Sequence, residues 1–518
     1  PRRAAAERRM QGLGRLLPVL PEAGVWGLRP DEPGVARARA LARPAVTGAE
    51  WSLARESAER PRPPAPPPLG PAPAFADHLF AGGRQWGLVS PRPVWGTDLT
   101  LPGPRPRIAI LDSGVDATHE EWGGPGSPLV APRSTVRNDP DASDWGFTGH
   151  GTHVAGVAAA PANGVGIVGV APAQAGTAEV IPVQIADREG RSTDATMIRG
   201  IRHAVRNDAR VINISAGGPG YSRAFHDTVL WATRQGALIV ASVGNEGQDL
   251  NSLNYPAAYP RVLGVGAQCD GVVSPDCPRP FGPATFSNRN RSVDVIAPGV
   301  NVLSSVPRRV AERSVAPGYA LKDGTSMAAP YVAGVAALVQ AANGNALSPY
   351  QVATQIINTA TDVPPRGRDD RSGHGIVNPR AAVTLRPPAD DVGEVNDDVK
   401  WLTGAKRLAA RRPQVIRATI DRDGDPDDVY AVLLRRGDRL RVTLSQRRGS
   451  FDLYLWGPGT RTVGTSRANL RRNLIAFRGG RGPRTKAIVH RAERTGRHYV
   501  NVFARRGEGE YRLAIRRG

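Results

Sequence analysis

The sequence predicts an α/β protein: a parallel sheet with helices on both faces, followed by a C-terminal antiparallel β-sandwich. Short apolar runs without polar alternation occur at residues 107–111, 211–214, 237–241 and 262–266. Helical stretches separate them, at residues 153–160, 193–207 and 222–235. Strands of this kind, divided by helices, form parallel sheets that are buried on both faces.

Beyond about residue 390 the pattern changes to short alternating runs divided by Gly, Pro and Asp, which is typical of a β-sandwich. These runs lie at residues 428–434, 438–444, 451–456, 486–490, 496–503 and 510–515. Near the N-terminal end, the pattern predicts a strand at 25–28, a helix at about 32–41 and a further strand-like piece at 45–51.

The length of 518 residues is enough for two or three domains. Eight of the thirteen residues from Pro61 to Pro73 are proline, which favours an extended and exposed linker. We therefore divide the chain into an N-terminal piece, the linker, an α/β domain and a sandwich, at residues 1–57, 58–74, 75–387 and 388–518.

The net charge of +21 is concentrated in the last domain, because residues 391–518 carry 29 basic and 14 acidic side chains. Such an excess fits either a surface that binds an anionic polymer or a solvated basic face. Nearly all the cations are arginine in a chain rich in Ala, Gly and Pro, so we favour the solvated face and expect no nucleic-acid partner. The longest apolar run, residues 332–342, is interrupted by Gly334 and Gln340, and we expect no membrane span.

The chain begins at Pro1, and we expect that a segment upstream, such as a signal peptide, has been removed. Cys269 and Cys277 lie in a loop rich in Pro, Gly and Asp, and their spacing fits no zinc motif. They are either two free thiols or one small disulfide, and export of the protein would favour the disulfide.

Four polar residues stand at glycine-rich ends of strands or starts of helices. Asp112 ends the strand at 107–111, and Asn245 follows the strand at 237–241. His150 and Ser326 stand where helices begin. Taken singly, each has an ordinary structural explanation: a turn-forming Asp or Asn, a histidine that binds metal together with His153, or a serine that caps a helix. Their coincidence at one edge of a parallel sheet, where ligands bind, indicates a reactive site.

The segments that contain these residues are Asp112-Ser113-Gly114, Gly149-His150-Gly151-Thr152-His153 and Gly324-Thr325-Ser326-Met327-Ala328. In this order they resemble the motifs of the subtilisin-like (S8 family) serine peptidases, over residues 75 to 387. The resemblance implies that Ser326 is the nucleophile, His150 the general base and Asp112 the group that orients His150. It also implies that Asn245 and the backbone N–H of Ser326 form the oxyanion hole.

Further residues are implied by the same resemblance. Ser215, Ala216 and Gly217 would pair with an extended substrate and form one wall of the pocket for the residue before the cut. Ser242 and Gly244 would form the opposite wall. No acidic residue lies in either segment, which points to broad, apolar-leaning specificity. A structural calcium ion is expected, with no organic cofactor, and its implied ligands are Glu121, Asn163, Val165 and Ile167.

The flanking regions have implied roles as well. Residues 24–56 resemble the latter part of a subtilisin propeptide, which acts as intramolecular inhibitor and chaperone, and residues 392–518 resemble the bacterial pre-peptidase C-terminal (PPC) domain. We expect a secreted, monomeric bacterial endopeptidase that acts on proteins and peptides. The alternative is an extracellular binding or adhesion protein that keeps the peptidase fold without turnover and binds through its basic sandwich.

Overall fold

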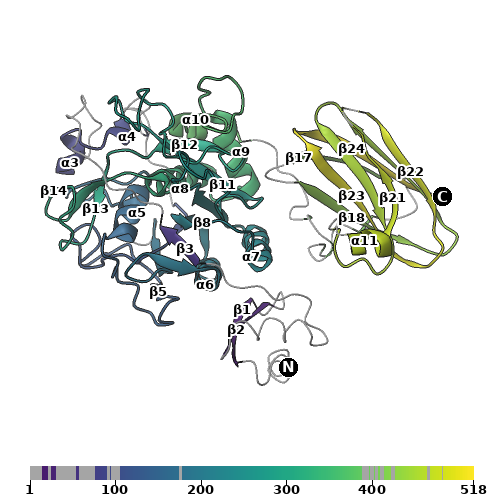
Figure 1. Cartoon of the computed structure of the whole chain (residues 1–518), viewed down its shortest axis with the longest axis horizontal. Coiled ribbons are helices and arrows are strands. Elements are labelled where there is room, and N and C mark those ends of the chain that lie inside the picture. Colours follow the sequence, from purple (N-terminus) through teal and green to yellow (C-terminus); the bar gives the residue numbers. More distant parts are fainter. Residues whose placement is uncertain are drawn as a thin grey trace. The chain divides into compact units, whose positions relative to one another are not determined.

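The computed structural model forms two compact units, Pro1–Pro388 and Ala389–Gly518 (Figure 1). It describes residues 14–20, 25–30, 54–57, 76–89, 94, 105–173, 178–387, 396, 399, 402, 407–408, 414–421, 426–463, 467–480, 482 and 484–518. The helix expected at about 32–41, the strand-like piece at 45–51 and the proline-rich linker lie outside the described residues.

A seven-stranded parallel sheet forms the centre of the first unit, in the order β12-β11-β10-β8-β4-β6-β5, which confirms the predicted fold class. The sheet also contains three strands that the apolar runs do not pick out; one of them, β6, carries Pro182. The strands are β4 (Arg107–Asp112), β5 (Arg133–Ser134), β6 (Val180–Gln184), β8 (Ala209–Ile214), β10 (Leu238–Ser242), β11 (Val262–Gln268) and β12 (Val295–Pro298).

Both faces of this sheet are buried because successive residues of each strand enter different cores. On β4, Ile108 and Ile110 belong to one core, whereas Ala109 and Leu111 belong to the other. Helices α5, α8 and α9 contribute to the first core, and α6 and α7 to the second. Their bounds are α5 (His150–Ala159), α6 (Asp194–Arg206), α7 (Arg223–Arg234), α8 (Thr325–Ala342) and α9 (Pro349–Thr359).

Helix α8 is apolar on all sides because it lies inside the molecule. Among the described residues it is the one helix with the length and hydropathy to cross a membrane, and 94% of it is buried within the fold. It packs closely on its surroundings: a Cβ added to Gly334 would lie 2.6 Å from Cβ of Val170 and 2.9 Å from the carbonyl oxygen of Ala158. The small residues of α8 thus permit close packing.

Shorter elements complete the first unit. Three small sheets have the orders β1-β2, β7-β3-β9 and β13-β15-β14. Their strands are β1 (Gly14–Leu20), β2 (Val25–Pro30), β3 (Ala54–Ser57), β7 (Arg191–Thr193), β9 (Ala216–Gly217), β13 (Val302–Ser305), β14 (Ser314–Ala316) and β15 (Tyr319–Lys322). The remaining helices are α3 (His78–Ala81), α4 (Trp86–Val89) and α10 (Pro379–Thr384).

The second unit is the predicted β-sandwich, with sheets in the orders β16-β18-β23-β20-β21 and β17-β24-β19-β22. Their strand pairs are antiparallel except β16 with β18. Its elements are β16 (Arg407–Leu408), β17 (Gln414–Asp421), β18 (Asp427–Leu434), β19 (Arg439–Gln446), β20 (Ser450–Trp456), α11 (Arg467–Asn473), β21 (Leu474–Arg478), β22 (Lys486–Arg491), β23 (Gly496–Arg506) and β24 (Glu508–Arg517).

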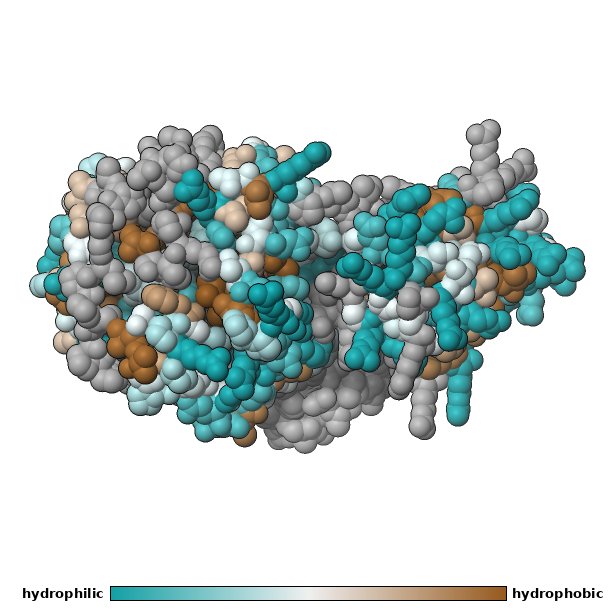
Figure 2. All heavy atoms as spheres, turned by 90° about the horizontal axis from the view of Figure 1, so that it is seen from above, coloured by the Kyte–Doolittle hydropathy of each residue, from teal (hydrophilic) through white to brown (hydrophobic). Residues whose placement is uncertain are grey.

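Basic residues of the sandwich alternate with its core. On β19, Arg439 and Arg441 are exposed, whereas Leu440, Val442 and Leu444 are fully buried. Hydrophilic side chains accordingly project from this unit in Figure 2. The alternation explains how strands rich in arginine can still build a sandwich, since only every second side chain must be apolar.

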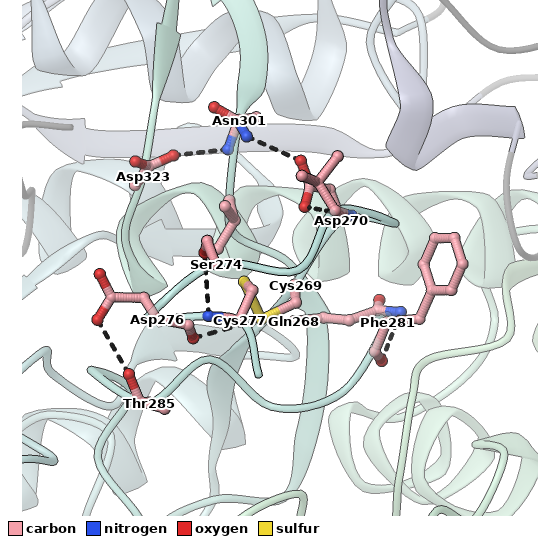
Figure 3. The surroundings of a disulfide bond; sticks show 12 residues. Gln268, Cys269, Asp270, Ser274, Asp276, Cys277, Phe281, Thr285, Asn301 and Asp323 are labelled. Atoms are coloured by element: carbon pink, nitrogen blue, oxygen red, sulfur yellow. Dashed lines mark hydrogen bonds between the residues drawn. A yellow bond between two sulfur atoms is a disulfide. The ribbon is translucent and has the colours of Figure 1, made fainter. Parts of the chain in front are cut away.

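A disulfide joins Cys269 and Cys277 just after β11. Around it, Asn301 lies between two carboxylates (Figure 3): its backbone N–H donates to Asp323 Oδ1 at 2.6 Å, and its side-chain amide donates to Asp270 Oδ2 at 2.8 Å. Of the two states considered for the cysteines, free thiols or a disulfide, the structure has the disulfide. The disulfide loop is connected through Asn301 to the segment that leads into α8.

Removing the disulfide should lower stability. We expect Cys269→Ala with Cys277→Ala to cost about 2–3 kcal/mol, because the unfolded chain regains the entropy of a small closed loop. Thermal and urea unfolding should be measured on a Ser326→Ala background, which prevents self-digestion. Val273→Ala, an exposed position in the same loop, is the control, and a loss no larger than that of this control would contradict the prediction.

Candidate active site

The structure brings the four predicted polar residues to the carboxyl edge of the parallel sheet. Asp112 is the last residue of β4, and Asn245 follows β10, which is separated from β4 by β8 alone. His150 is the first residue of α5 and Ser326 the second residue of α8, and these two helices pack against each other. Parallel strands end at one edge, so residues far apart in the sequence come together.

His150 is bonded to Asp112 inside the protein. The two atoms His150 Nδ1 and Asp112 Oδ1 are 2.7 Å apart, and the two side chains are 3% and 2% exposed. The same carboxylate oxygen accepts the backbone N–H of Ser113 at 2.8 Å. A ring nitrogen beside a carboxylate carries the proton and donates it, which leaves Nε2 as the basic nitrogen of the neutral imidazole.

A second buried carboxylate holds this pair in place. Asp144 Oδ1 accepts the Ser113 hydroxyl at 2.9 Å, and Asp144 Oδ2 accepts the Thr152 hydroxyl and N–H at 2.6 and 3.0 Å. Ser113 Oγ in turn accepts the N–H of Gly151. Burial raises the pKa of Asp144, an effect that these hydrogen bonds oppose. The network ties the end of β4 to the first turn of α5.

The glycines around His150 are required by close packing. A Cβ on Gly151 would lie 2.2 Å from the carbonyl oxygen of Gly114, and Gly149 has φ of 66°, which other residues rarely adopt. The helix begins at His150, where the sequence places a helix start, three residues before the apolar helical stretch at 153–160. It starts where the backbone turns sharply against the Asp112 loop.

His153 has a different environment from His150. It is fully buried, and its Nε2 lies 3.0 Å from the carbonyl oxygen of Val302 and 3.2 Å from that of Ala320. Burial holds its pKa well below the usual value, so the ring is neutral. His153 thus contacts β13 and β15, and its bonds to backbone carbonyls account for its burial.

Ser326 does not cap α8, because the residue at the cap position is Gly324, with φ of 150° and no side chain. Four residues after Ser326, Pro330 has no N–H to donate to the Ser326 carbonyl. The Ser215 hydroxyl donates to that carbonyl instead, at 2.8 Å. In the opposite direction, the Ser326 hydroxyl donates to the carbonyl of Ser215 at 3.0 Å. These two bonds fasten the start of α8 to the segment that leads into β9.

Asn245 is held by Thr325, the residue before Ser326. Its Oδ1 accepts the N–H of Thr325 at 3.0 Å and the Thr325 hydroxyl at 2.9 Å. Because the oxygen is occupied, the amide nitrogen Nδ2 must point away from Thr325. That nitrogen is buried and has no hydrogen-bond partner among the described residues. A fixed, unused donor beside Ser326 is suited to an oxygen that becomes negative during acyl transfer.

The predicted substrate walls lie next to Ser326. Ala216 and Gly217 form β9, and Ser242 ends β10. Gly244 has φ of 99° and donates its N–H to the Thr325 hydroxyl at 3.3 Å. Strand β3 from the N-terminal part of the chain pairs antiparallel with β9 and β7. An extended segment of the chain thus already occupies the edge that the sequence assigns to substrate.

The predicted calcium residues also come together. Glu121 Oε1 accepts the N–H of Ile167 at 2.9 Å, and Asn163 Oδ1 accepts the N–H of Val165 at 3.0 Å. Asp77 joins this loop, because its Oδ1 accepts the N–H groups of Asn163 and Gly164 at 3.1 Å each.

These residues fit a hard cation. The carboxylates of Asp77 and Glu121 are both buried, and Glu121 Oε2 has no hydrogen-bond donor among the described residues. Burial raises the pKa of Glu121 to about 8, and the nearby Asp77 adds to the effect. Three or more His, Cys, Asp or Glu side chains placed to hold a metal do not occur in the described part of the chain. Carbonyl and amide oxygens, which suit Ca²⁺, would therefore complete the set.

Sequence reasoning missed four residues that the structure places at these sites. They are Thr325, which orients Asn245; Asp144, which supports the Asp112 loop; Asp77, beside Glu121; and Asn254, which lies between the two substrate walls. The position of Thr325 next to Ser326 was a usable signal. The other three contact residues that belong to other elements, from 8 to 87 positions away in the sequence, and no motif joins them.

A family model described as the subtilase family matches residues 103–375. Subtilisin BL from Lederbergia lenta is 35% identical over 297 residues, covering 57% of this chain and 97% of that protein. M-protease from Shouchella clausii (strain KSM-K16) is 35% identical over 297 residues, covering 57% of this chain and 69% of that protein.

Among solved structures, fervidolysin from Fervidobacterium pennivorans, described as a keratinolytic enzyme related to subtilisin, matches with a TM-score of 0.62. At 23% identity, covering 94% of this chain and 83% of that chain, it shows likeness of fold alone. The family match and the identity to the subtilisins carry the assignment: the chain belongs to the subtilase family and is a subtilisin-like serine endopeptidase.

Proposed function

We propose that the protein hydrolyses peptide bonds of extracellular proteins through an acyl-enzyme formed on Ser326. The observation that carries this proposal is the buried 2.7 Å hydrogen bond between His150 Nδ1 and Asp112 Oδ1, at the sheet edge where α8 presents Ser326. A serine hydroxyl is a weak nucleophile until a neighbouring base takes its proton. Asp112 keeps His150 in the tautomer that can do this.

The steps follow from the positions of these groups. Ser326 Oγ attacks the substrate carbonyl carbon while His150 accepts the hydroxyl proton, and Asp112 stabilises the imidazolium. Asn245 Nδ2 donates to the oxygen that becomes negative. His150 then gives its proton to the leaving amine, and a water molecule, activated by His150, hydrolyses the ester and frees Ser326.

Secretion belongs to the same proposal. The Cys269–Cys277 disulfide supports a location outside the reducing cytoplasm, because disulfides persist in oxidising compartments. A calcium ion at Glu121, Asn163, Val165 and Ile167, with Asp77 as an added neighbour, would neutralise two buried carboxylates and hold the loop against α3. It would stabilise the fold and take no part in the chemistry.

Ser326→Ala should abolish hydrolysis of a denatured protein substrate, because no other group replaces the nucleophile. Ser314→Ala, an exposed serine on β14, should leave the rate unchanged. Labelling with a serine-directed phosphonate should modify Ser326 in the parent and in the control, and nothing in Ser326→Ala. Undiminished hydrolysis by Ser326→Ala would sink the mechanism, and a properly folded parent that is neither labelled nor active would favour the binding protein without turnover.

Asn245→Leu should lower kcat by about 100- to 1,000-fold with little change in KM, since the amide donates only to the transition state. Steady-state kinetics on a peptide p-nitroanilide would measure this. Thr325→Val, which removes one of the two donors to Asn245 Oδ1, should give a smaller loss of kcat, and Thr325→Ser should restore most of it. A loss confined to KM in Asn245→Leu would contradict the assigned role.

Calcium should raise thermal stability. We expect the Ser326→Ala protein to unfold at a higher temperature in Ca²⁺ than in EDTA. At a free Ca²⁺ concentration about 100 times the dissociation constant, the free energy of unfolding should rise by about 2.7 kcal/mol. Glu121→Gln should reduce this increase, whereas Glu189→Ala, an exposed carboxylate beside Arg191, should leave it intact. Equal calcium effects in both variants would place the ion elsewhere.

A further inference from the structure

Asp323 is a buried carboxylate that the proposed reaction does not use. It lies between the end of β15 and Gly324, and its side chain is 1% exposed. Asp323 Oδ2 accepts a hydrogen bond from Arg313 Nη1 at 2.8 Å, and the arginine side chain is itself 11% exposed. Asp323 Oδ1 accepts the backbone N–H of Asn301 at 2.6 Å. Each carboxylate oxygen thus has a fixed partner, and the side chain has little freedom to move.

Asn301 extends this contact to the disulfide loop. Its Oδ1 accepts a hydrogen bond from Arg313 Nη2. Its amide donates to Oδ2 of Asp270, the residue after Cys269, at 2.8 Å (Figure 3). Arg313 therefore contacts Asp323 and Asn301 with its two terminal nitrogens, and such a forked contact has a defined geometry. The segments after β11 and β12 and the residue before β14 converge on Asp323.

Gly324 makes these contacts necessary for the segment that follows. Its φ of 150° is a value that other residues rarely adopt, and it has no side chain of its own. Its N–H donates to the carbonyl oxygen of Gly299 at 2.8 Å. A glycine allows the chain to turn but does not by itself fix the direction of the turn. The contacts before and at Gly324 therefore determine where Thr325 lies.

Thr325 is the residue through which Asp323 reaches the reaction. Its N–H and hydroxyl donate to Asn245 Oδ1 at 3.0 and 2.9 Å, and so determine where Asn245 Nδ2 points. We propose that Asp323 is a positioning residue for the oxyanion hole. By holding the backbone before Gly324, it keeps Thr325 in place and hence Asn245 directed toward the reacting oxygen. The inference rests on the proposed function, in which Asn245 is that donor.

A purely structural role for Asp323 would affect stability alone, and the sandwich supplies a matched comparison. Lys486 Nζ and Asp452 Oδ1 are 3.6 Å apart, and the two side chains are 6% and 2% exposed. Removing one partner of a buried ion pair usually destabilises a protein, because the other charge is left uncompensated. Loss of the Asp452 charge should therefore lower stability without changing kcat. Loss of the Asp323 charge should lower both.

Asp323→Asn in the full chain tests the inference. The substitution keeps the size of the side chain and an oxygen for the Asn301 N–H, but it removes the charge that pairs with Arg313. We expect kcat on a peptide p-nitroanilide to fall about 10- to 100-fold, with KM within about 2-fold of the parent, because a small misplacement of a transition-state donor lowers kcat alone. Asp452→Asn, assayed at a temperature at which both variants are folded by circular dichroism, should retain the kcat of the parent.

Further variants keep the test decisive if Asp323→Asn does not fold. Arg313→Gln should also lower kcat, and Arg313→Lys, which retains the charge, should recover most of it. Asn301→Gly keeps the N–H to Asp323 and suits the backbone φ of 51°, but it removes the side-chain contacts with Arg313 and Asp270. It should give a smaller loss of kcat. Unchanged kcat in the folded variants at positions 301, 313 and 323 would overturn the inference.

A double-mutant cycle identifies the group through which Asp323 acts. In an Asn245→Leu background, Asp323→Asn should change kcat by less than about 3-fold, because the donor that it orients is already missing. The full loss in that background would overturn the action through Asn245, and an equal loss of kcat in Asp452→Asn would reduce the effect to stability and overturn it too.

Failure of the proposed function gives a different result. A folded parent that neither turns over substrate nor reacts with a serine-directed phosphonate would overturn the proposed function and this inference together. If the parent is active and Asn245→Leu loses kcat, whereas Asp323→Asn and Arg313→Gln do not, the positioning role of Asp323 alone is wrong.

Discussion

The two hydrogen bonds between Ser215 and Ser326 connect the start of α8 to the segment that leads into β9. Pro330 removes the donor that α8 would otherwise offer to the Ser326 carbonyl, and the Ser215 hydroxyl takes its place. A proline within a helix usually costs stability, but here the lost bond is replaced by one that reaches another element. The edge that the sequence predicts to bind substrate and the start of α8 are consequently fixed to each other.

Hydrogen bonds from neighbouring residues also fix the side chains of Asn245 and Asp112. Thr325 donates both its N–H and its hydroxyl to Asn245 Oδ1, so the amide nitrogen points away from Thr325 and can serve as the proposed donor. Asp112 Oδ1 accepts hydrogen bonds from the Ser113 N–H and from His150 Nδ1. Asp144 Oδ1 accepts the Ser113 hydroxyl and so stabilises the same loop. In each case a neighbouring residue determines the direction of the group to which the proposed mechanism assigns a role. Such fixed dipoles lose little energy to reorganisation when charge develops.

The pairing of β3 with β9 gives the N-terminal part of the chain a physical relation to the site. A strand that completes a short sheet between β7 and β9 satisfies backbone groups at an edge that would otherwise face water. A substrate peptide bound at the edge that the sequence predicts for it would have to displace β3.

Sequence alone was enough to predict the fold class and the six strands of the sandwich that alternate clearly, and to propose the reactive residues, because periodicity and short motifs are local properties. It did not reveal β17, β21 or the Pro-containing β6. It also permitted a capping role for Ser326, whereas the cap position is occupied by Gly324, which has no side chain. Asp77, Asp144 and Asn254 became visible only in three dimensions. Their contacts join separate elements, from 8 to 87 positions apart in the sequence, and only the folded chain decides which of these elements meet.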